Sequence, residues 1–139
     1  MLASMRNLIL AAAFASVAFA QAPAARLSCD GNMATVRVSE IPKTGSLEGF
    51  MKAVAAHGEW YRSHGAEDKV IAVRIVVRDE ATKTQKYSDT QVMTYHIAPA
   101  VYKPGPAHDD AYEAFVKMYR DNSEIKQQYN VCLPKGLVK

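Results

Sequence analysis

The first 20 residues carry the three parts of a cleavable secretory signal, and they decide which part of the chain has to fold. Arg6 supplies the positive charge, residues 8–17 form an almost unbroken apolar run, and Ala18-Phe19-Ala20 has small residues around a bulky one. The run is shorter than the ~20 apolar residues of a bilayer-spanning helix, and no later segment reaches that length. We therefore expect cleavage after Ala20, a mature chain that begins at Gln21 without a transmembrane segment, and a periplasmic or secreted location.

Residues 21–139 are long enough for one domain with its own core, and their charges do not indicate a polyanionic partner. The whole chain has 17 Lys and Arg against 14 Asp and Glu, and the basic residues are scattered among the acidic ones. A nucleic-acid-binding domain would favour a clustered basic face. We expect a single domain at 21–139 and no nucleic-acid partner.

The two cysteines lie near the two ends of the expected mature chain, at Cys29 and Cys132. A disulfide between them would close a loop of about 100 residues, worth ~4.7 kcal/mol in the chain-entropy model. An oxidising compartment would favour that bond. Neither cysteine belongs to a Cys-x-x-Cys pair, so thioredoxin-like redox chemistry and a structural zinc site are weakly supported. We predict a structural disulfide, with no metal and no cofactor.

Periodicity predicts a strand, a helix and a second strand in the first half of the domain. Residues 34–41 alternate apolar and polar side chains, as a half-buried strand does. Ser46 can cap a helix whose apolar residues recur at helical spacing, and Gly65 is well placed just after its end. Residues 70–78 form the clearest strand, with Ile71, Val73, Ile75 and Val77 on one face.

The second half of the domain predicts a returning strand, a second helix and a last strand. Asp110 and Glu113 resemble a capping box at the start of that helix. The expected segments are a connection at 79–85, a strand at 86–97, a non-helical stretch at 99–106, a helix at 110–122, an ambiguous stretch at 123–128 and a short strand at 129–133.

The resulting order is β-α-β-β-α-β, the split βαβ or ferredoxin-like plan of an α+β domain. In this plan the last strand lies antiparallel beside the first, and both helices cover one face of the antiparallel sheet. The start of the first strand then meets the end of the last strand. Cys29 and Cys132 occupy those two ends, so the predicted topology and the predicted disulfide agree.

Over residues 33–133 the chain resembles the dimeric α+β barrel superfamily, which includes stress-responsive barrel proteins, cofactor-free monooxygenases and EthD-like proteins. The resemblance rests on the element order and on the segment from Glu59 to Gly65, Glu-Trp-Tyr-Arg-Ser-His-Gly, which closes the first helix before an apolar strand. It implies two ferredoxin-like units that pair their sheets, with a ligand cavity in each half. The signal, the disulfide and the proline-rich loop depart from the family, and no diagnostic catalytic motif is present.

Three histidines are the candidates for chemistry: His57, His64 and His96. His57 and His64 lie on nearly the same side of the first helix but about 10 Å apart along its axis, too far to chelate one metal alone. If either shared a cavity with His96, a proton-transfer or metal site could form. Otherwise, His64 is a helix-end residue near the last carbonyls and His57 is a rim residue beside the core.

Polar side chains on the second and third predicted strands suggest an anion-binding cavity. Arg74 and Arg78 share one face of their strand, and Thr94 and His96 lie on the next strand, so together they could line a cavity for an anionic ligand. The alternative is an ordinary solvent-facing sheet surface.

The sheet face that the helices leave free is expected to form a homodimer interface. We assign Val70, Ala72, Val76 and Val92 to this face, where contact across a two-fold axis would bury them. A one-residue slip in register would exchange the two faces of every strand.

Two classes of function fit these observations. The first is an exported, non-enzymatic domain that binds a small ligand or an envelope protein, because no catalytic constellation is visible. The alternative is a small cofactor-independent enzyme of the α+β barrel type, with His57, His64 or His96 as acid or base. A shared enclosed cavity for these histidines would favour chemistry, whereas scattered exposed rings would favour binding.

Overall fold

A computed structural model of the chain describes residues 28–101 and 103–138. The expected signal at 1–20 and the expected new N-terminus at Gln21 lie outside the described residues. No helix within the described ranges is long and apolar enough to cross a bilayer. The elements are β1 (Asn32–Glu40), α1 (Leu47–Ser63), β2 (Lys69–Arg78), β3 (Gln85–Ile97), α2 (Asp110–Asn122) and β4 (Glu124–Leu133).

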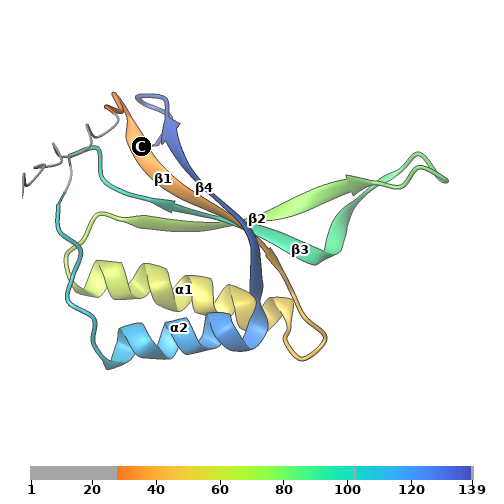
Figure 1. Ribbon diagram of the computed structural model, residues 1–139, viewed down its shortest axis with the longest axis horizontal. Coiled ribbons are helices and arrows are strands. Elements are labelled where there is room, and N and C mark those ends of the chain that lie inside the picture. Colours follow the sequence, from red (N-terminus) through yellow and green to blue (C-terminus); the bar gives the residue numbers. More distant parts are fainter. Residues whose placement is uncertain (1–27, 102, 139) are drawn as a thin grey trace, which may run out of the picture.

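The strands form one antiparallel sheet in the order β2-β3-β1-β4. Both helices lie on the same side of this sheet, so that the domain has a helix layer and a sheet layer (Figure 1). The hairpin of β2 and β3 extends beyond the helices as a two-stranded arm (Figure 1). The predicted ferredoxin-like α+β fold is confirmed.

The predicted disulfide is also confirmed. Cys29 is bonded to Cys132 with a Cα–Cα distance of 5.6 Å, within the range of ordinary disulfides. Met33 of β1 is the register partner of Cys132 in β4. The bond therefore joins the segment before the central strand β1 to the end of the edge strand β4.

The last strand is longer than its apolar pattern predicts. α2 ends at Asn122, and Ser123 turns the chain into an extended conformation while its backbone N–H donates to Tyr119 O. β4 then begins at Glu124, so the ambiguous stretch at 123–128 belongs mostly to the strand. β4 is an edge strand, and its first half carries polar side chains that water or neighbouring strands can satisfy.

The assignment of the two sheet faces from the sequence is wrong. Val92 is fully buried and packs with Phe50 and Val54 of α1, and Val70 and Ala72 lie against the same cluster. Val92, Val70 and Ala72 therefore lie on the sheet face that the helices cover, and not on the opposite face. Val76 lies beyond a register shift in the β2–β3 arm and is 54% exposed.

The face turned away from the helices, here called the open face, carries the alternate residues of each strand. Ile71, Tyr95, Val36 and Tyr129 are register partners and make a continuous row across all four strands. Val73, Met93 and Val38 form the next row. Ile71, Val73 and Tyr129 are 42–52% exposed, so this face presents apolar side chains to solvent.

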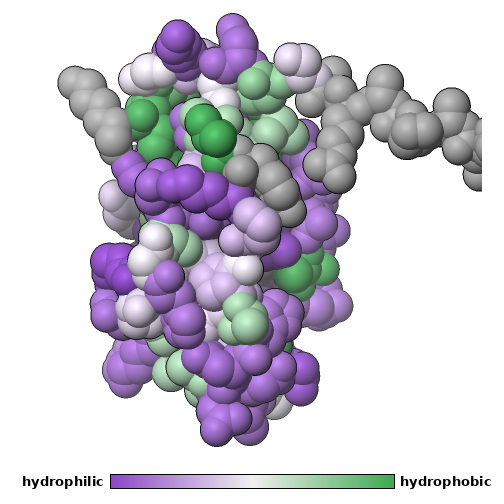
Figure 2. All heavy atoms as spheres, turned by 90° about the vertical axis from the view of Figure 1, so that its left-hand side faces the viewer, coloured by the Kyte–Doolittle hydropathy of each residue, from purple (hydrophilic) through white to green (hydrophobic). Residues whose placement is uncertain are grey.

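The two helices pack through aromatic side chains. Phe50 of α1 meets Tyr119 of α2 edge to face at 5.5 Å between ring centroids, and Trp60, Tyr61 and Phe115 form a second cluster toward the other end. Seen from the end where α1 finishes and α2 begins, the outer surface of the helices is largely hydrophilic, and the strongest hydrophobic colour gathers toward the sheet end (Figure 2). Most apolar side chains of the helices thus pack between the helix layer and the sheet.

Candidate functional site

A cavity of about 410 Å³ lies between the helix layer and the sheet. Both helices contribute an aromatic wall: Phe50, Trp60, Tyr61, Tyr112, Phe115 and Tyr119. The sheet contributes a mainly polar floor: Arg37, Ser39, Thr94 and His96. The loop before α2 adds Gly105, Pro106 and His108. We call this space the interlayer cavity.

The floor of the interlayer cavity follows from the register of β1 and β3. Arg37 is the partner of Thr94, Ser39 is the partner of Val92, and Thr35 is the partner of His96. Val92 packs against α1, so pleating places the other members of these pairs on the helix-facing side as well. The alternation of Thr35, Arg37 and Ser39 resembles a solvent-facing pattern in the sequence, which is why Arg37 was not predicted.

His57 and His96 meet in the interlayer cavity, with their ring centroids 5.4 Å apart. His57 comes from α1, is 8% exposed and stacks on Phe115 at 4.3 Å between centroids. Its Nδ1 lies 3.5 Å from the hydroxyl of Tyr119. Of the two histidines predicted on the first helix, His57 therefore shares a cavity with the histidine of β3.

Burial dominates the electrostatics of His57. It lowers the pKa of His57 to about 4, and the neighbouring charges of His96 and Arg37 act in the same direction. His57 is therefore a neutral base at pH 7. Burial also raises the pKa of Tyr61 to about 12, and that of Tyr119 above its ordinary range. The helix side of the cavity is thus uncharged at neutral pH.

Asp68 holds His96 from outside the cavity. Asp68 lies in the connection between α1 and β2, and its Oδ1 is 3.1 Å from His96 Nε2. The carboxylate fixes the direction of the ring and favours a proton on Nε2, which leaves Nδ1 as the other polar atom of the ring. Asp68 could not be predicted from the sequence, because its contact with His96 joins a loop and a strand that are 28 positions apart.

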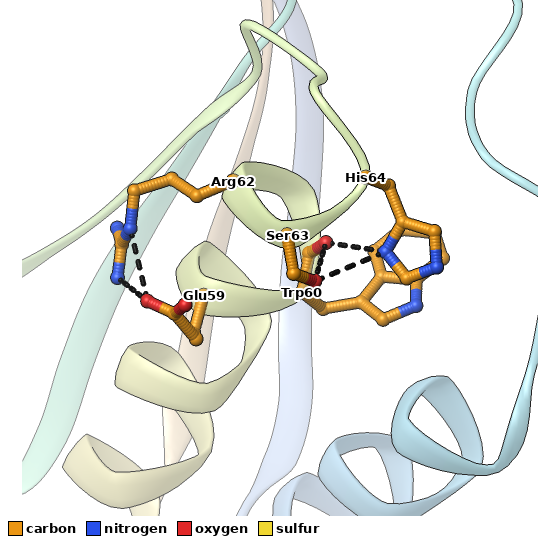
Figure 3. Close-up of polar contacts among 5 residues, drawn as sticks. All are labelled: Glu59, Trp60, Arg62, Ser63 and His64. Carbon is orange, nitrogen blue, oxygen red and sulfur yellow. Dashed lines mark hydrogen bonds and ion pairs between the residues drawn. The ribbon is translucent and has the colours of Figure 1, made fainter.

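His64, the third predicted histidine, lies outside the interlayer cavity. Its Nδ1 is 2.7 Å from the carbonyl oxygen of Trp60 and 3.2 Å from Ser63 Oγ at the end of α1 (Figure 3). Its Nε2 is 3.0 Å from Asp109 Oδ2 at the start of α2. On the other side of the same turn, Arg62 pairs with Glu59 and points away from His64 (Figure 3). His64 thus joins the two helix ends.

The predicted anion-binding set is only partly assembled. Thr94 and His96 line the interlayer cavity, but Arg74 and Arg78 do not. Arg74 lies over the ring of Tyr87 at 4.7 Å, and Arg78 Nε is 3.6 Å from Glu80 Oε1 in the β2–β3 arm. Arg37 is instead the arginine that the fold places beside Thr94 and His96.

Within residues 28–101 and 103–138, no group of three His, Cys, Asp or Glu side chains is placed to hold a metal ion. The polar groups that line the interlayer cavity are imidazole rings, hydroxyls and one guanidinium, which suit hydrogen bonding and proton transfer. The arrangement can bind a polar group at its floor and an apolar or aromatic body against its helix wall.

No protein-family model and no curated protein matches the chain. Among solved structures it is similar to a phage SAM lyase in complex with S-methyl-5'-thioadenosine, at 12% identity and a TM-score of 0.26. That alignment covers 81% of this chain and 97% of the lyase chain.

Proposed function

We propose that this chain is an exported domain that binds a small molecule in the interlayer cavity. The observation that carries the proposal is the cavity of about 410 Å³ with an aromatic wall on one side and converging polar groups on the other. Its volume falls within the ~300–1,000 Å³ of small-molecule sites. A compact molecule of one or two rings fits a site of this size.

A cavity-filling variant tests this proposal. Val116 of α2 lines the cavity, and the next residue, Lys117, is exposed. Saturation-transfer NMR with phenol as the probe should detect contact with the wild-type protein, and Val116→Phe should remove most of the signal. Lys117→Phe adds the same ring outside the cavity and should leave the signal unchanged. If the signal of Val116→Phe stays as strong as that of the wild type and of Lys117→Phe, phenol binds outside the cavity.

A second candidate function is acid–base catalysis without a cofactor. The observation that favours it is the pairing of His57 with His96 beside the Tyr119 hydroxyl, with Asp68 positioning His96. A neutral His57 could accept a proton from a carbon acid, and His96 could return one.

Acetophenone in D₂O provides a test, because deuterium uptake at its methyl group reports proton abstraction by NMR. Uptake in the wild type that is lost in both His57→Gln and His96→Gln would support catalysis, and uptake no faster than in buffer would exclude it for this probe.

Export to the periplasm or the medium is supported by the secretory signal pattern and by the disulfide. The disulfide between Cys29 and Cys132 is the kind of bond that oxidising compartments maintain. Mass spectrometry of protein recovered from the periplasm or medium should find Gln21 at the N-terminus. A full-length product retained in the cytoplasm would overturn this part of the proposal.

We also propose a homodimer, now through the open face. The support is the row of Ile71, Tyr95, Val36 and Tyr129, an apolar strip across the whole sheet that the helices do not cover. The resemblance to the dimeric α+β barrel superfamily points to the same arrangement, in which two units pair their sheets. The interlayer cavity lies on the opposite side of the sheet, so a ligand would not compete with the partner subunit.

A further inference from the structure

Arg37 brings a charge into the interlayer cavity without a carboxylate to balance it. It lies in the middle of β1, between Thr94 of β3 and Gln128 of β4 in the register. Its Nε donates a hydrogen bond of 2.7 Å to Gln128 Oε1, a neutral acceptor. In the described part of the chain, no Asp or Glu forms an ion pair with it. The two terminal nitrogens of the guanidinium are therefore available to bind a ligand.

The charge of Arg37 acts on the rings across the cavity. It is one of the causes that lower the pKa of His57, and it opposes the rise in the pKa of Tyr61 and Tyr119. These groups come from both helices, so the guanidinium lies within electrostatic reach of side chains on α1 and on α2. Because His57 and the two tyrosines are neutral at pH 7, none of them compensates the positive charge.

Asp109 and Asp68 each contact a residue that lines the cavity, but both carboxylates are already engaged. Asp109 accepts a hydrogen bond of 2.8 Å from Trp60 Nε1 and caps α2. Asp68 contacts His96 at 3.1 Å and does not line the cavity. The cavity thus offers a single uncompensated positive charge at its floor and aromatic surface above it. A partly desolvated cation of this kind is stabilised by an anion that also makes hydrogen bonds.

We propose that Arg37 binds the carboxylate of a small aromatic monoanion whose ring lies against the helix wall of the interlayer cavity. The proposal rests on the ligand-binding function above and assigns the chemical class of the ligand. The planar guanidinium matches a carboxylate with two parallel hydrogen bonds. One cation balances one negative charge, which favours a carboxylate over a phosphate dianion. Thr94 and Tyr61 supply hydroxyls along the same cavity.

Trp60 provides the measurement, since it is the one tryptophan of the chain and lines the cavity. Its fluorescence is titrated at pH 7 with benzoate and with benzamide, which has nearly the same shape but no charge. Wild-type protein should bind benzoate roughly tenfold to hundredfold more tightly than benzamide, the range for a charge-assisted hydrogen-bonded pair. Phenyl phosphate should bind more weakly than benzoate.

Variants of two arginines test whether Arg37 causes the preference for benzoate over benzamide. Arg37→Gln should abolish the preference for benzoate while leaving benzamide within about twofold of its wild-type affinity, and Arg37→Lys should keep part of the preference because it keeps the charge. Arg74→Gln removes an arginine outside the cavity and should change neither affinity. Circular dichroism of each variant checks that it is folded.

The outcomes separate this proposal from the one on which it rests. Equal binding of benzoate and benzamide to the wild type would overturn the role of Arg37 and leave small-molecule binding in place. A preference for benzoate that survives in folded Arg37→Gln would also overturn it. Absence of binding by either probe, together with no phenol contact in the NMR experiment, would remove both proposals.

Discussion

The indole nitrogen of Trp60 donates a hydrogen bond of 2.8 Å to Asp109 Oδ1 and so joins the last turn of α1 to the start of α2. The same oxygen accepts from the backbone N–H of Tyr112, which makes Asp109 the N-cap of α2. The other carboxylate oxygen contacts His64. One exposed carboxylate therefore fixes the helix ends that border the interlayer cavity.

Replacing this carboxylate should loosen the helix pair. Asp109→Ala removes the N-cap and the acceptor for Trp60, and we expect the melting temperature to fall by roughly 5 °C. The fluorescence of Trp60 should shift at the same time, because its indole loses a fixed partner. Asp110→Ala, the neighbouring acid in the first turn, should have a much smaller effect. Similar losses in both variants would mean that helix-dipole charge, and not the contact with Trp60, stabilises this end.

The disulfide should account for a large share of the stability. It closes a loop with a sequence separation of 103, so its reduction should lower the free energy of unfolding by about 2–5 kcal/mol. Chemical denaturation with and without a reducing agent measures the difference. The double variant Cys29→Ser, Cys132→Ser should match the reduced protein and should not respond to the reducing agent. Thiol labelling of denatured, unreduced wild type that finds free cysteines would contradict the bond.

The order of the elements and the disulfide could be predicted because both depend on local signals. The period of the apolar residues distinguishes strands from helices within a few residues, and the export signal favours a bond between the two cysteines. The assignment of faces could not be predicted in the same way. Val70 and Ala72 alternate with Ile71 and Val73, so β2 is apolar on both sides and its pattern does not say which side the helices cover.

The candidate site could be predicted only in part for a related reason. His57 and His96 were expected to matter only if the fold brought them together, and the sequence does not give their distance. Arg37 could not be recognised as a cavity residue, because a polar residue between apolar ones in a strand is usually exposed to solvent. Here the helix-facing side of the sheet is polar where the interlayer cavity leaves room, and the open face is apolar. The usual rule is therefore inverted at the interlayer cavity.

The buried His57 should make stability depend on pH. Its pKa is about 4 in the folded protein and about 6.5 in the unfolded chain, so the unfolded chain binds more protons between these values. Stability from this group is fully present above about pH 6.5 and is lost as the pH falls toward 4, by on the order of 3 kcal/mol. Chemical denaturation at pH 7.5 and pH 4 measures the loss.

Two phenylalanine variants isolate this contribution. His57→Phe cannot be protonated and should fit beside Phe115, so its stability should fall less than that of the wild type over the same pH range. His108→Phe makes the same change at an exposed position and should follow the wild type. If His57→Phe and the wild type lose equal stability between pH 7.5 and pH 4, another group is responsible for the pH dependence.

A charge on the open face should prevent the proposed homodimer from forming. Val73 lies on this face beside Met93 and is 42% exposed, so a glutamate there would place a charge inside a sheet-to-sheet interface. We expect sedimentation equilibrium to show a dimer for the wild type and a folded monomer for Val73→Glu. Val76→Glu is the matched control, since Val76 is 54% exposed but lies past the register shift in the β2–β3 arm. Dissociation by Val76→Glu alone would place the interface on the arm, and a wild type that stays monomeric at high micromolar concentration would exclude the dimer.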